Sequence, residues 1–477
     1  MVCAAAHTQS APASSQPPTA PRFNPHQILI KPKPGTSLAT LANFHAAQKG
    51  EVVRTFEGIG NLQIVRVSIS ETVPGFIRKY ESSGLVEFAE PDYVGQTFAT
   101  TPNDTYYANG TLWGLNKIDA PGGWDVRTSA SNIVVAVLDT GIRYTHEDLA
   151  ANMWVNPNDG GHGWNSLTGT NNPYDDATPF SISHGTLIAG VLGAVGNNGK
   201  GVVGVAWQVQ IMACQWLTNS NGKGNLSDCI TCIDYARTNG ARIINASWGF
   251  PTNSLALSNA VNSLRDAGII LVAACGNETN NIDTNPTYPS GYHLDNIVSV
   301  ASTTTNDTLA AYSNYGATNV HLAAPGEQIY STISPQDNFY GFGSGTSLAA
   351  PYVTGTLALM LAKYPTETHQ QIISRLLNAA DPVPALSGKC VTGGRLNLHK
   401  ALSPPISLTA TRAVSGLPFQ LHLSGGPNRI CVLEATTNLT NWTSIFTNTT
   451  STNGTFDFID NQSTNTTRRF YRAVSSP

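Results

Sequence analysis

The feature that most constrains the fold is a regular alternation of apolar runs and helix-like segments between residues 130 and 275. The apolar runs 133–138 and 269–274 are continuous, which is typical of strands buried on both faces of a sheet. Strands that alternate with helices form βαβ units with parallel strands. We therefore expect an α/β fold, with a mostly parallel sheet flanked by helices. Further strands are predicted at 210–217 and 243–246, and helices after His184 and at 225–238 and 254–267.

Two smaller regions flank the α/β region. Residues 26–94 have the order strand, helix, two strands, helix, strand, which predicts a small α+β module. Beyond Pro404 and Pro405, short apolar runs are separated by Asn, Thr, Ser and Gly, as in a small antiparallel β-sandwich. The first residues are rich in Ser, Pro, Ala and Gln and are predicted to be disordered. The expected organisation is 1–25 disordered, 26–98 α+β, 99–403 α/β and 404–477 all-β.

Composition argues against several classes of function. Charged residues make up 12% of the chain, about half of the usual ~25%, and the formal net charge is −4. Without a long basic run, the sequence gives no support to binding of nucleic acid or of an anionic membrane. It contains no stretch of about 18 apolar residues, so we expect no membrane span.

Three stretches carry residues suited to nucleophilic catalysis. The apolar run within 132–148 ends at Asp139, which places a carboxylate at the C-terminal end of a buried strand. His184 opens the small-residue stretch His-Gly-Thr-Leu-Ile-Ala-Gly. Ser347 lies in Gly-Thr-Ser-Leu-Ala-Ala-Pro-Tyr-Val-Thr-Gly (345–355), where the unpaired first-turn N–H groups of a helix suit a developing oxyanion. Each residue alone is more often a cap, a turn or a structural side chain, so their combination carries the prediction.

In the chain order Asp139, His184, Ser347, these stretches resemble the motifs of the subtilisin-like serine proteases, or subtilases. The resemblance extends from Pro102 to about Leu402. It implies a serine endopeptidase in which Ser347 attacks the peptide carbonyl and forms an acyl-enzyme. His184 would take the proton and pass it to the leaving amine, while Asp139 would hold the His tautomer.

A fourth stretch resembles the subtilase strand end that supplies an oxyanion donor. Residues 273–277 read Ala-Ala-Cys-Gly-Asn, and the resemblance assigns the donor role to the Asn277 side chain. The backbone N–H of Ser347 would be the second donor. Outside the resemblance, an Asn that follows Gly is more often a turn residue.

The resemblance also implies a substrate cleft. Residues 247–249 resemble the Ser-Leu-Gly strand that pairs with substrate backbone and lines the S1 pocket, with Trp248 as a departure. A mostly apolar cleft favours a large apolar P1 residue and broad specificity, and Glu278 at the pocket mouth would tolerate a basic one. The alternative for Trp248 is that it only fills the core. The residues expected to bind substrate are Ser247, Trp248, Gly249, Ala274, Gly276 and Glu278.

A structural calcium site is a further implication of the resemblance. Asp148 matches a family aspartate that binds Ca²⁺, and residues 196–202 resemble the loop that supplies Asn198 and backbone carbonyls. Oxygen ligands suit this hard cation. The alternative is that Asn-Asn-Gly forms an ordinary turn. No cofactor is expected for catalysis.

The module at 26–94 resembles the inhibitory propeptide of subtilases. This implies a secreted zymogen that cleaves itself between Gly95 and Pro102, with Phe98 as the preferred P1 residue and Gln96 or Thr100 as alternatives. Residues 4–6, all Ala, fit the cleavage site of a signal peptide. We expect a monomer whose partners are protein or peptide substrates and its own propeptide.

Two other classes of function are weighed against this hypothesis. An inactive protease homologue used for binding would lack a catalytic residue, and none of the expected ones is missing. A lipase or esterase of the α/β-hydrolase type would carry Gly-x-Ser-x-Gly, with its His after the Ser. Here residue 349 is Ala instead of the second Gly, and His184 precedes Ser347.

Overall fold

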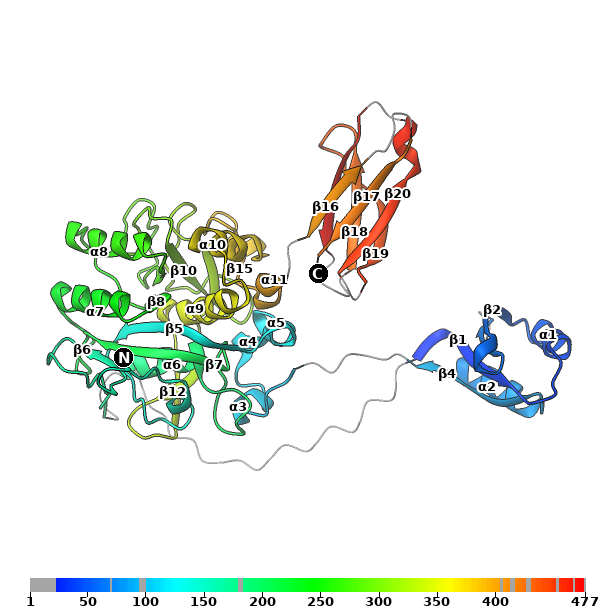
Figure 1. Ribbon diagram of the computed structural model, residues 1–477, viewed down its shortest axis with the longest axis horizontal. Helices are drawn as coiled ribbons and strands as arrows, with labels where there is room; N and C mark the ends of the chain where they lie inside the picture. Colours follow the sequence, from blue (N-terminus) through cyan, green and yellow to red (C-terminus); the bar gives the residue numbers. More distant parts are fainter. Residues whose placement is uncertain are drawn as a thin grey trace. The chain divides into compact units, whose positions relative to one another are not determined.

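The computed structural model describes residues 23–68, 71–93, 100–178, 183–403, 406–411, 417–425, 430–451, 454–465 and 468–475. The chain divides into two compact units, Met1–Phe98 and Ala99–Pro477 (Figure 1). Most of the segment 1–25, for which disorder is predicted, lies outside the described residues. Among the described residues, no helix has both the length and the apolar character needed to cross a bilayer.

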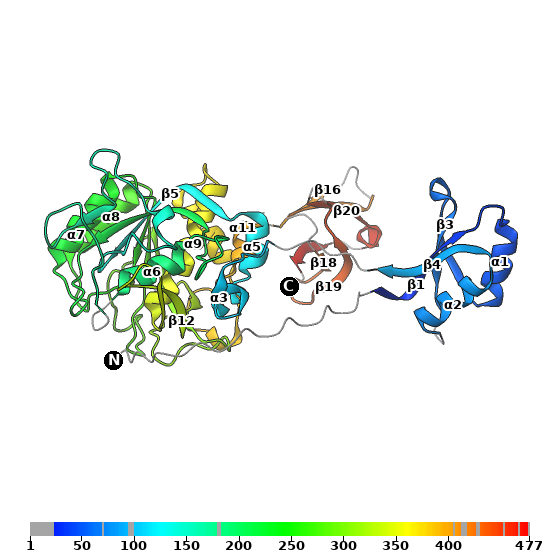
Figure 2. The same cartoon turned by 90° about the horizontal axis from the view of Figure 1, so that it is seen from below.

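The N-terminal unit is a four-stranded antiparallel sheet with two helices (Figure 2), in the element order expected from the sequence. Its strand order is β2-β3-β1-β4. Each helix begins after a residue, Ser37 or Thr72, whose hydroxyl accepts a first-turn N–H. Ile28, Phe76 and Tyr80 are fully buried in its core. The elements are β1 (Phe23–Pro32), α1 (Leu38–Ala47), β2 (Glu51–Phe56), β3 (Leu62–Arg66), α2 (Val73–Ser82) and β4 (Val86–Tyr93).

The second unit is built on a nine-stranded sheet of order β14-β15-β11-β10-β9-β8-β5-β7-β6. All neighbouring pairs are parallel except β14 and β15 at one edge. The prediction of a mostly parallel sheet is confirmed. The strands are β5 (Ser129–Asp139), β6 (Gly163–Asn165), β7 (Gln208–Gln215), β8 (Ile243–Ala246), β9 (Ile270–Ala274), β10 (Ile297–Thr303), β11 (Leu322–Pro325), β14 (Asp381–Pro382) and β15 (Gly394–Arg395).

Helices cover both faces of this sheet (Figure 1). Along β5, Val135 and Val137 pack in one core cluster with α6 and α9, whereas Ala136 and Leu138 pack in another with α7 and α8. Successive side chains of a strand point to opposite faces, so a strand covered on both faces has a continuous apolar sequence. The helices are α3 (Thr105–Ala108), α4 (Trp113–Lys117), α5 (Ala120–Val126), α6 (His184–Gly193), α7 (Leu226–Thr238), α8 (Leu255–Asp266), α9 (Thr346–Lys363), α10 (His369–Asn378) and α11 (Leu398–Leu402).

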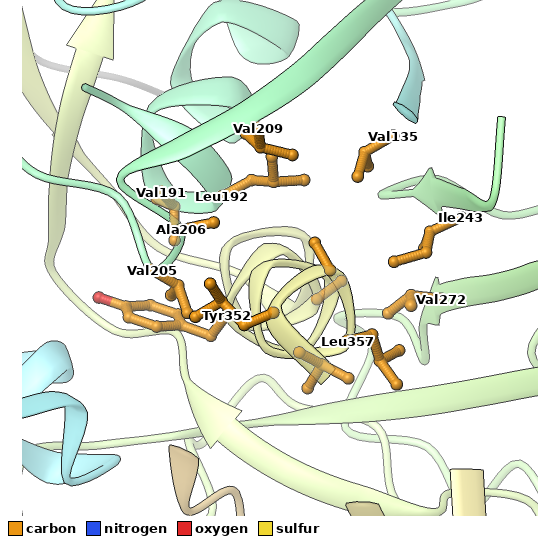
Figure 3. Packing of buried hydrophobic residues seen from close by; sticks show 14 of the residues in the cluster. Val135, Val191, Leu192, Val205, Ala206, Val209, Ile243, Val272, Tyr352 and Leu357 are labelled. Carbon is orange, nitrogen blue, oxygen red and sulfur yellow. The ribbon is translucent and has the colours of Figure 1, made fainter. Parts of the chain in front are cut away.

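Helix α9 runs through the centre of one core cluster. Figure 3 shows it nearly end-on, with Val135, Ile243 and Val272 of the sheet on one side and Leu192 of α6 nearby. Every residue from 346 to 362 is buried, which explains why the helix is apolar all round. A hairpin of β12 (Ile329–Ile333) and β13 (Phe339–Gly343) leads into its N-terminus.

The C-terminal strands form two three-stranded sheets, β16-β17-β20 and β19-β18-β21, that share one apolar core. This confirms the all-β prediction. The sequence analysis missed β16, a mostly exposed strand of 5 residues in which only Leu408 and Ala410 alternate with Ser and Thr. The strands are β16 (Ser407–Thr411), β17 (Phe419–Ser424), β18 (Ile430–Thr436), β19 (Thr443–Thr449), β20 (Thr455–Asp460) and β21 (Phe470–Ser475).

Candidate active site

The site begins with a buried carboxylate and an imidazole. Asp139 is the last residue of β5 and is fully buried, and its Oδ1 accepts a hydrogen bond from the N–H of Thr140 at 2.8 Å. His184 is the first residue of α6, and its Nδ1 lies 2.8 and 2.9 Å from the two Asp139 oxygens. Because a carboxylate only accepts, Nδ1 carries the proton and Nε2 is free to accept another.

The charge of this pair controls the titration of the imidazole. Burial by itself lowers the pKa of His184, but the hydrogen-bonded Asp139 carboxylate and the nearby carboxylate of Asp175 outweigh it. The pKa of His184 is therefore raised. The same carboxylates would stabilise an imidazolium at this position.

Ser347 lies in the first turn of α9, with 8% of its surface exposed. Gly343 brings this turn next to α6, since a Cβ on Gly343 would contact Leu187 at 2.7 Å and Leu348 at 3.6 Å. Leu187 lies one turn after His184, and Leu348 directly follows Ser347. The N-terminal turns of the two helices are therefore packed together.

A carbonyl left without its helical partner in α9 connects Ser347 to the segment that follows β8. Pro351 has no N–H to donate to the carbonyl of Ser347, four residues earlier. The hydroxyl of Ser247 donates to that carbonyl instead, at 2.8 Å. Ser247 accepts in turn from Asn245, which accepts from Thr354 on α9. This chain of hydrogen bonds fixes the end of β8 and Ser247 to the helix that carries Ser347.

Asn277 follows β9, and its side-chain amide has a defined direction. Its Oδ1 accepts from both the N–H and the hydroxyl of Thr346, at 2.9 and 3.0 Å. The opposite end of the amide, Nδ2, faces the space beside Gly345, where an added Cβ would lie 2.9 Å from Ser347 Oγ and 3.4 Å from Asn277 Nδ2. Glycine at 345 therefore keeps open a space bordered by a hydroxyl and an amide donor. Sequence analysis did not single out Thr346 as the residue that orients Asn277.

A pocket of about 620 Å³ opens beside Ser347. It brings together all six residues expected to bind substrate, together with Asn277 and Ser347. Sequence analysis missed several other residues of its wall, because they come from loops without a recognisable motif. The full lining is Ser247, Trp248, Gly249, Phe250, Pro251, Ala274, Gly276, Asn277, Glu278, Asn280, Asn285, Pro286, Thr287, Thr346 and Ser347.

Trp248 belongs both to the pocket wall and to the core. It is 9% exposed and packs edge-on against Trp216, with ring centroids 5.0 Å apart, and against Phe250 at 5.7 Å. Glu278 is exposed beside the pocket, where its Oε2 accepts from Asn314 Nδ2 at 2.7 Å and from the N–H of Asn277 at 2.9 Å. The pocket therefore combines an aromatic wall with one carboxylate.

The two residues expected to bind calcium lie together. Oδ1 of Asp148 accepts from Asn198 Nδ2 at 2.8 Å, and Oδ2 accepts from the N–H of Val202 at 2.8 Å and the hydroxyl of Tyr340 at 2.9 Å. The structure adds Asp104, which sequence analysis missed because its neighbours in sequence carry no metal-binding pattern. Burial and the charge of Asp148 raise the pKa of Asp104.

The carboxylates of Asp104 and Asp148 could together hold a cation. Asp104 and Asp148 are fully buried carboxylates without a basic partner among the described residues, and a cation would relieve their repulsion. In the described part of the chain, no group of three or more His, Cys, Asp or Glu side chains has the arrangement of a metal site. Any calcium site here would therefore depend on amide and carbonyl oxygens as well as the two carboxylates.

Comparison with known proteins agrees with the fold and identifies the family. Residues 130–408 match the subtilase family model, and residues 9–92 match the fervidolysin N-terminal prodomain. The chain is 36% identical to a thermophilic serine proteinase of Bacillus sp. strain AK1 over 332 residues, 69% of this chain and 76% of that protein. It is 36% identical to thermitase of Thermoactinomyces vulgaris over 303 residues, 63% of this chain and 99% of that protein.

The structure also resembles a solved protease structure from Pseudoalteromonas arctica, with 31% sequence identity and a TM-score of 0.54. The match covers 64% of this chain and 99% of the protease chain. The fold and these matches define a serine endopeptidase preceded by a prodomain. The chain belongs to the subtilase family. This assignment excludes the α/β-hydrolase alternative.

Proposed function

We propose that this chain is a secreted, self-processing endopeptidase that cleaves peptide bonds through an acyl-enzyme, with Asp139, His184 and Ser347 as its catalytic triad. The observation that carries the proposal is the hydrogen bond between the buried Asp139 and His184, since His184 opens a helix whose first turn packs against the turn that holds Ser347. A peptide carbonyl is a poor electrophile and a serine hydroxyl a poor nucleophile, so the reaction needs a base and an oxyanion site.

In the proposed reaction Ser347 Oγ attacks the carbonyl carbon while His184 Nε2 takes the hydroxyl proton. Asp139 keeps the other ring proton on Nδ1 and stabilises the imidazolium. His184 then returns the proton to the leaving amine, and the C–N bond breaks. Water, activated by the same imidazole, hydrolyses the ester, which releases the acid and restores Ser347.

The proposed oxyanion donors are Asn277 Nδ2 and the N–H of Ser347. Thr346 supports this assignment because it holds the amide oxygen of Asn277, which turns Nδ2 toward the space beside Gly345. We expect Asn277→Leu to lower kcat by about 10²–10³ with a small change in KM, since the donor acts mainly in the transition state. Steady-state kinetics on a peptide p-nitroanilide measures both quantities.

Asn306→Leu is a matched control for this substitution, because Asn306 lies in an exposed turn outside the pocket. It is expected to leave kcat unchanged. A folded Asn277→Leu protein with normal kcat would remove Asn277 from the mechanism.

We propose broad specificity with a preference for large apolar P1 residues. The aromatic wall formed by Trp248 and Phe250 supports this preference. Glu278, exposed beside the pocket, favours secondary cleavage after basic residues. Cleavage products of casein, sequenced by mass spectrometry, report the P1 distribution.

We propose that the prodomain is an intramolecular inhibitor that the enzyme removes from itself. Its sheet supports an interacting role, since β2 and β4 are edge strands, and an edge strand presents backbone N–H and C=O groups with which an added strand can pair. The proposed cleavage lies between Gly95 and Pro102. The candidate P1 residues Gln96 and Phe98 lie outside the described residues, whereas Thr100 is among them. Secretion is proposed from the Ala-rich stretch at residues 4–6.

Two measurements test the proposed activity as a whole. The mature protein should hydrolyse casein, and a fluorophosphonate should block hydrolysis and attach to Ser347, as read by peptide mass spectrometry. A folded protein that neither cleaves casein nor reacts with the fluorophosphonate would contradict the proposal.

A structural Ca²⁺ held by Asp104, Asp148 and the loop of Asn198 is also proposed. With excess chelator we expect Tm to fall by roughly 8–16 °C, because a site saturated 1,000-fold above its Kd stabilises the folded state by about 4 kcal/mol. Calorimetry with and without chelator measures the shift. Asp148→Asn should remove most of the difference, whereas the exposed control Asp234→Asn on α7 should keep it. An unchanged Tm in excess chelator would rule the site out.

A further inference from the structure

We propose that Asp175 is a positioning residue for His184: its buried carboxylate holds Ser183 and Thr186 on either side of the imidazole and adds a second negative charge to that of Asp139. The inference rests on the proposed role of His184 as the base. It concerns a residue in the loop before α6, in which sequence analysis found no function.

Both oxygens of Asp175 are used, and the residue is fully buried. Oδ2 accepts hydrogen bonds from the hydroxyl of Thr186 and, at 3.3 Å, from that of Ser183. Oδ1 accepts from the N–H of Ala177 and from Asn219 Nδ2, each at 3.1 Å. Four neutral groups therefore donate to this carboxylate, and among the described residues no basic side chain forms an ion pair with it.

These donors connect Asp175 to the segments around His184. The hydroxyl of Thr186 also accepts the N–H of Arg143 at 3.0 Å, in the loop after β5. The hydroxyl of Ser183 accepts the N–H of Ser334 at 2.6 Å, and the Ser334 hydroxyl donates to the carbonyl of Asp175 at 2.9 Å. Asp175 thus ties the start of α6 to the segments after β5 and after β12, and so fixes the direction from which His184 enters the site.

The charge of Asp175 reaches His184 through the protein interior. Burial, with a further contribution from Asp139, raises the pKa of Asp175 to about 6, against the lowering effect of its hydrogen bonds. Asp175 is in turn one of the groups that raise the pKa of His184. A neutral donor shell does not cancel the field of a carboxylate as a paired Arg or Lys would.

Other charges near this loop are already compensated or lie at the surface. Arg143 forms an ion pair with Asp337, and Asp176 is exposed and accepts from Asn219 Nδ2 at 2.9 Å. Asp139 is bonded directly to His184. Asp175 is therefore the second buried carboxylate that acts on the imidazole.

The test is the pH dependence of kcat/KM in Asp175→Asn. Removal of the negative charge lowers the pKa of His184, so the acid limb of the profile should move to lower pH by about half a unit to one unit. The rate of fluorophosphonate attachment to Ser347 against pH should show the same shift without turnover. Asp176→Asn is the matched control, because it removes a neighbouring exposed charge, and its acid limb should stay in place.

The outcomes separate this inference from the proposed function. A wild-type protein that the fluorophosphonate does not label would refute the proposed triad. An Asp175→Asn protein with lower rates at every pH but an unmoved acid limb would overturn the inference and leave the triad intact. If Asp175→Asn does not fold, Asn219→Ala replaces it: loss of one donor makes the Asp175 carboxylate easier to protonate, and a smaller shift in the same direction is expected. An unmoved limb in that variant would also overturn the inference.

Discussion

Replacement of Ser347 by alanine is expected to lower kcat for peptide hydrolysis by about 10⁶, the scale of losing the nucleophile of a serine protease. The change removes one oxygen from a residue that is 8% exposed and leaves its carbonyl bonded to Ser247, so the fold should be retained. Residual catalysis of roughly 10³–10⁴ over water can persist from binding and the oxyanion donors. Hydrolysis of casein and of a peptide p-nitroanilide, with circular dichroism to confirm folding, measures the effect.

The matched control is Ser344→Ala, an exposed serine three residues earlier whose hydroxyl accepts the N–H of Gln328. It should keep nearly full activity. If a folded Ser347→Ala protein hydrolysed casein at a rate near that of the wild type, the proposed nucleophile would be wrong.

The same variant tests self-processing. Wild-type protein should be cut between Gly95 and Pro102, whereas purified Ser347→Ala protein should keep its prodomain. The physical reason is that a tethered segment reaches its own cleft at high effective concentration, and the cut then depends only on the nucleophile. Maturation of Ser347→Ala at the same bond without added protease would disprove self-cleavage, even with the protease assignment intact.

Asp139→Asn is expected to lower kcat by about 10⁴. The N–H of Thr140 needs an acceptor, so the asparagine should keep its oxygen there and turn its NH₂ toward His184 Nδ1. Two donors cannot pair, so His184 would carry its proton on Nε2 instead, where it can no longer accept the proton of Ser347. Removal of the carboxylate also lowers the pKa of His184, which makes the imidazolium harder to form.

The kinetic signature distinguishes this mechanism from loss of structure. KM should change little, and fluorophosphonate labelling of Ser347 should slow in parallel with kcat, because both need the same base. Asp176→Asn again serves as the control for loss of a carboxylate in this region. Unchanged kcat in a folded Asp139→Asn protein would show that His184 is oriented by another group.

Local patterns were sufficient to predict the fold class, and they also nominated the residues of the proposed triad. A continuous run of apolar residues, as in β5, predicts a strand that is buried on both faces. This signal lies within the strand's own sequence. The motifs around Asp139, His184 and Ser347 are local as well, because each needs a strand end or a helix start that its neighbours in sequence specify. Strand β16 is mostly exposed, and its alternation of Leu408 and Ala410 with Ser and Thr spans only 5 residues, so the local pattern did not single it out.

Long-range contacts decided what surrounds those residues. Thr346 orients Asn277, Ser247 satisfies the carbonyl that Pro351 leaves free, and Trp248 is shared between core and cleft. In the sequence, Asp175 cannot be distinguished from other acidic loop residues. Only the fold brings Thr186 and Asn219 within hydrogen-bond distance of its carboxylate. The physical reason is that burial and hydrogen-bond partners are properties of the packed chain. The sequence by itself determined the fold class and which groups are proposed for the chemistry, and the tertiary structure alone decided how those groups are oriented and charged.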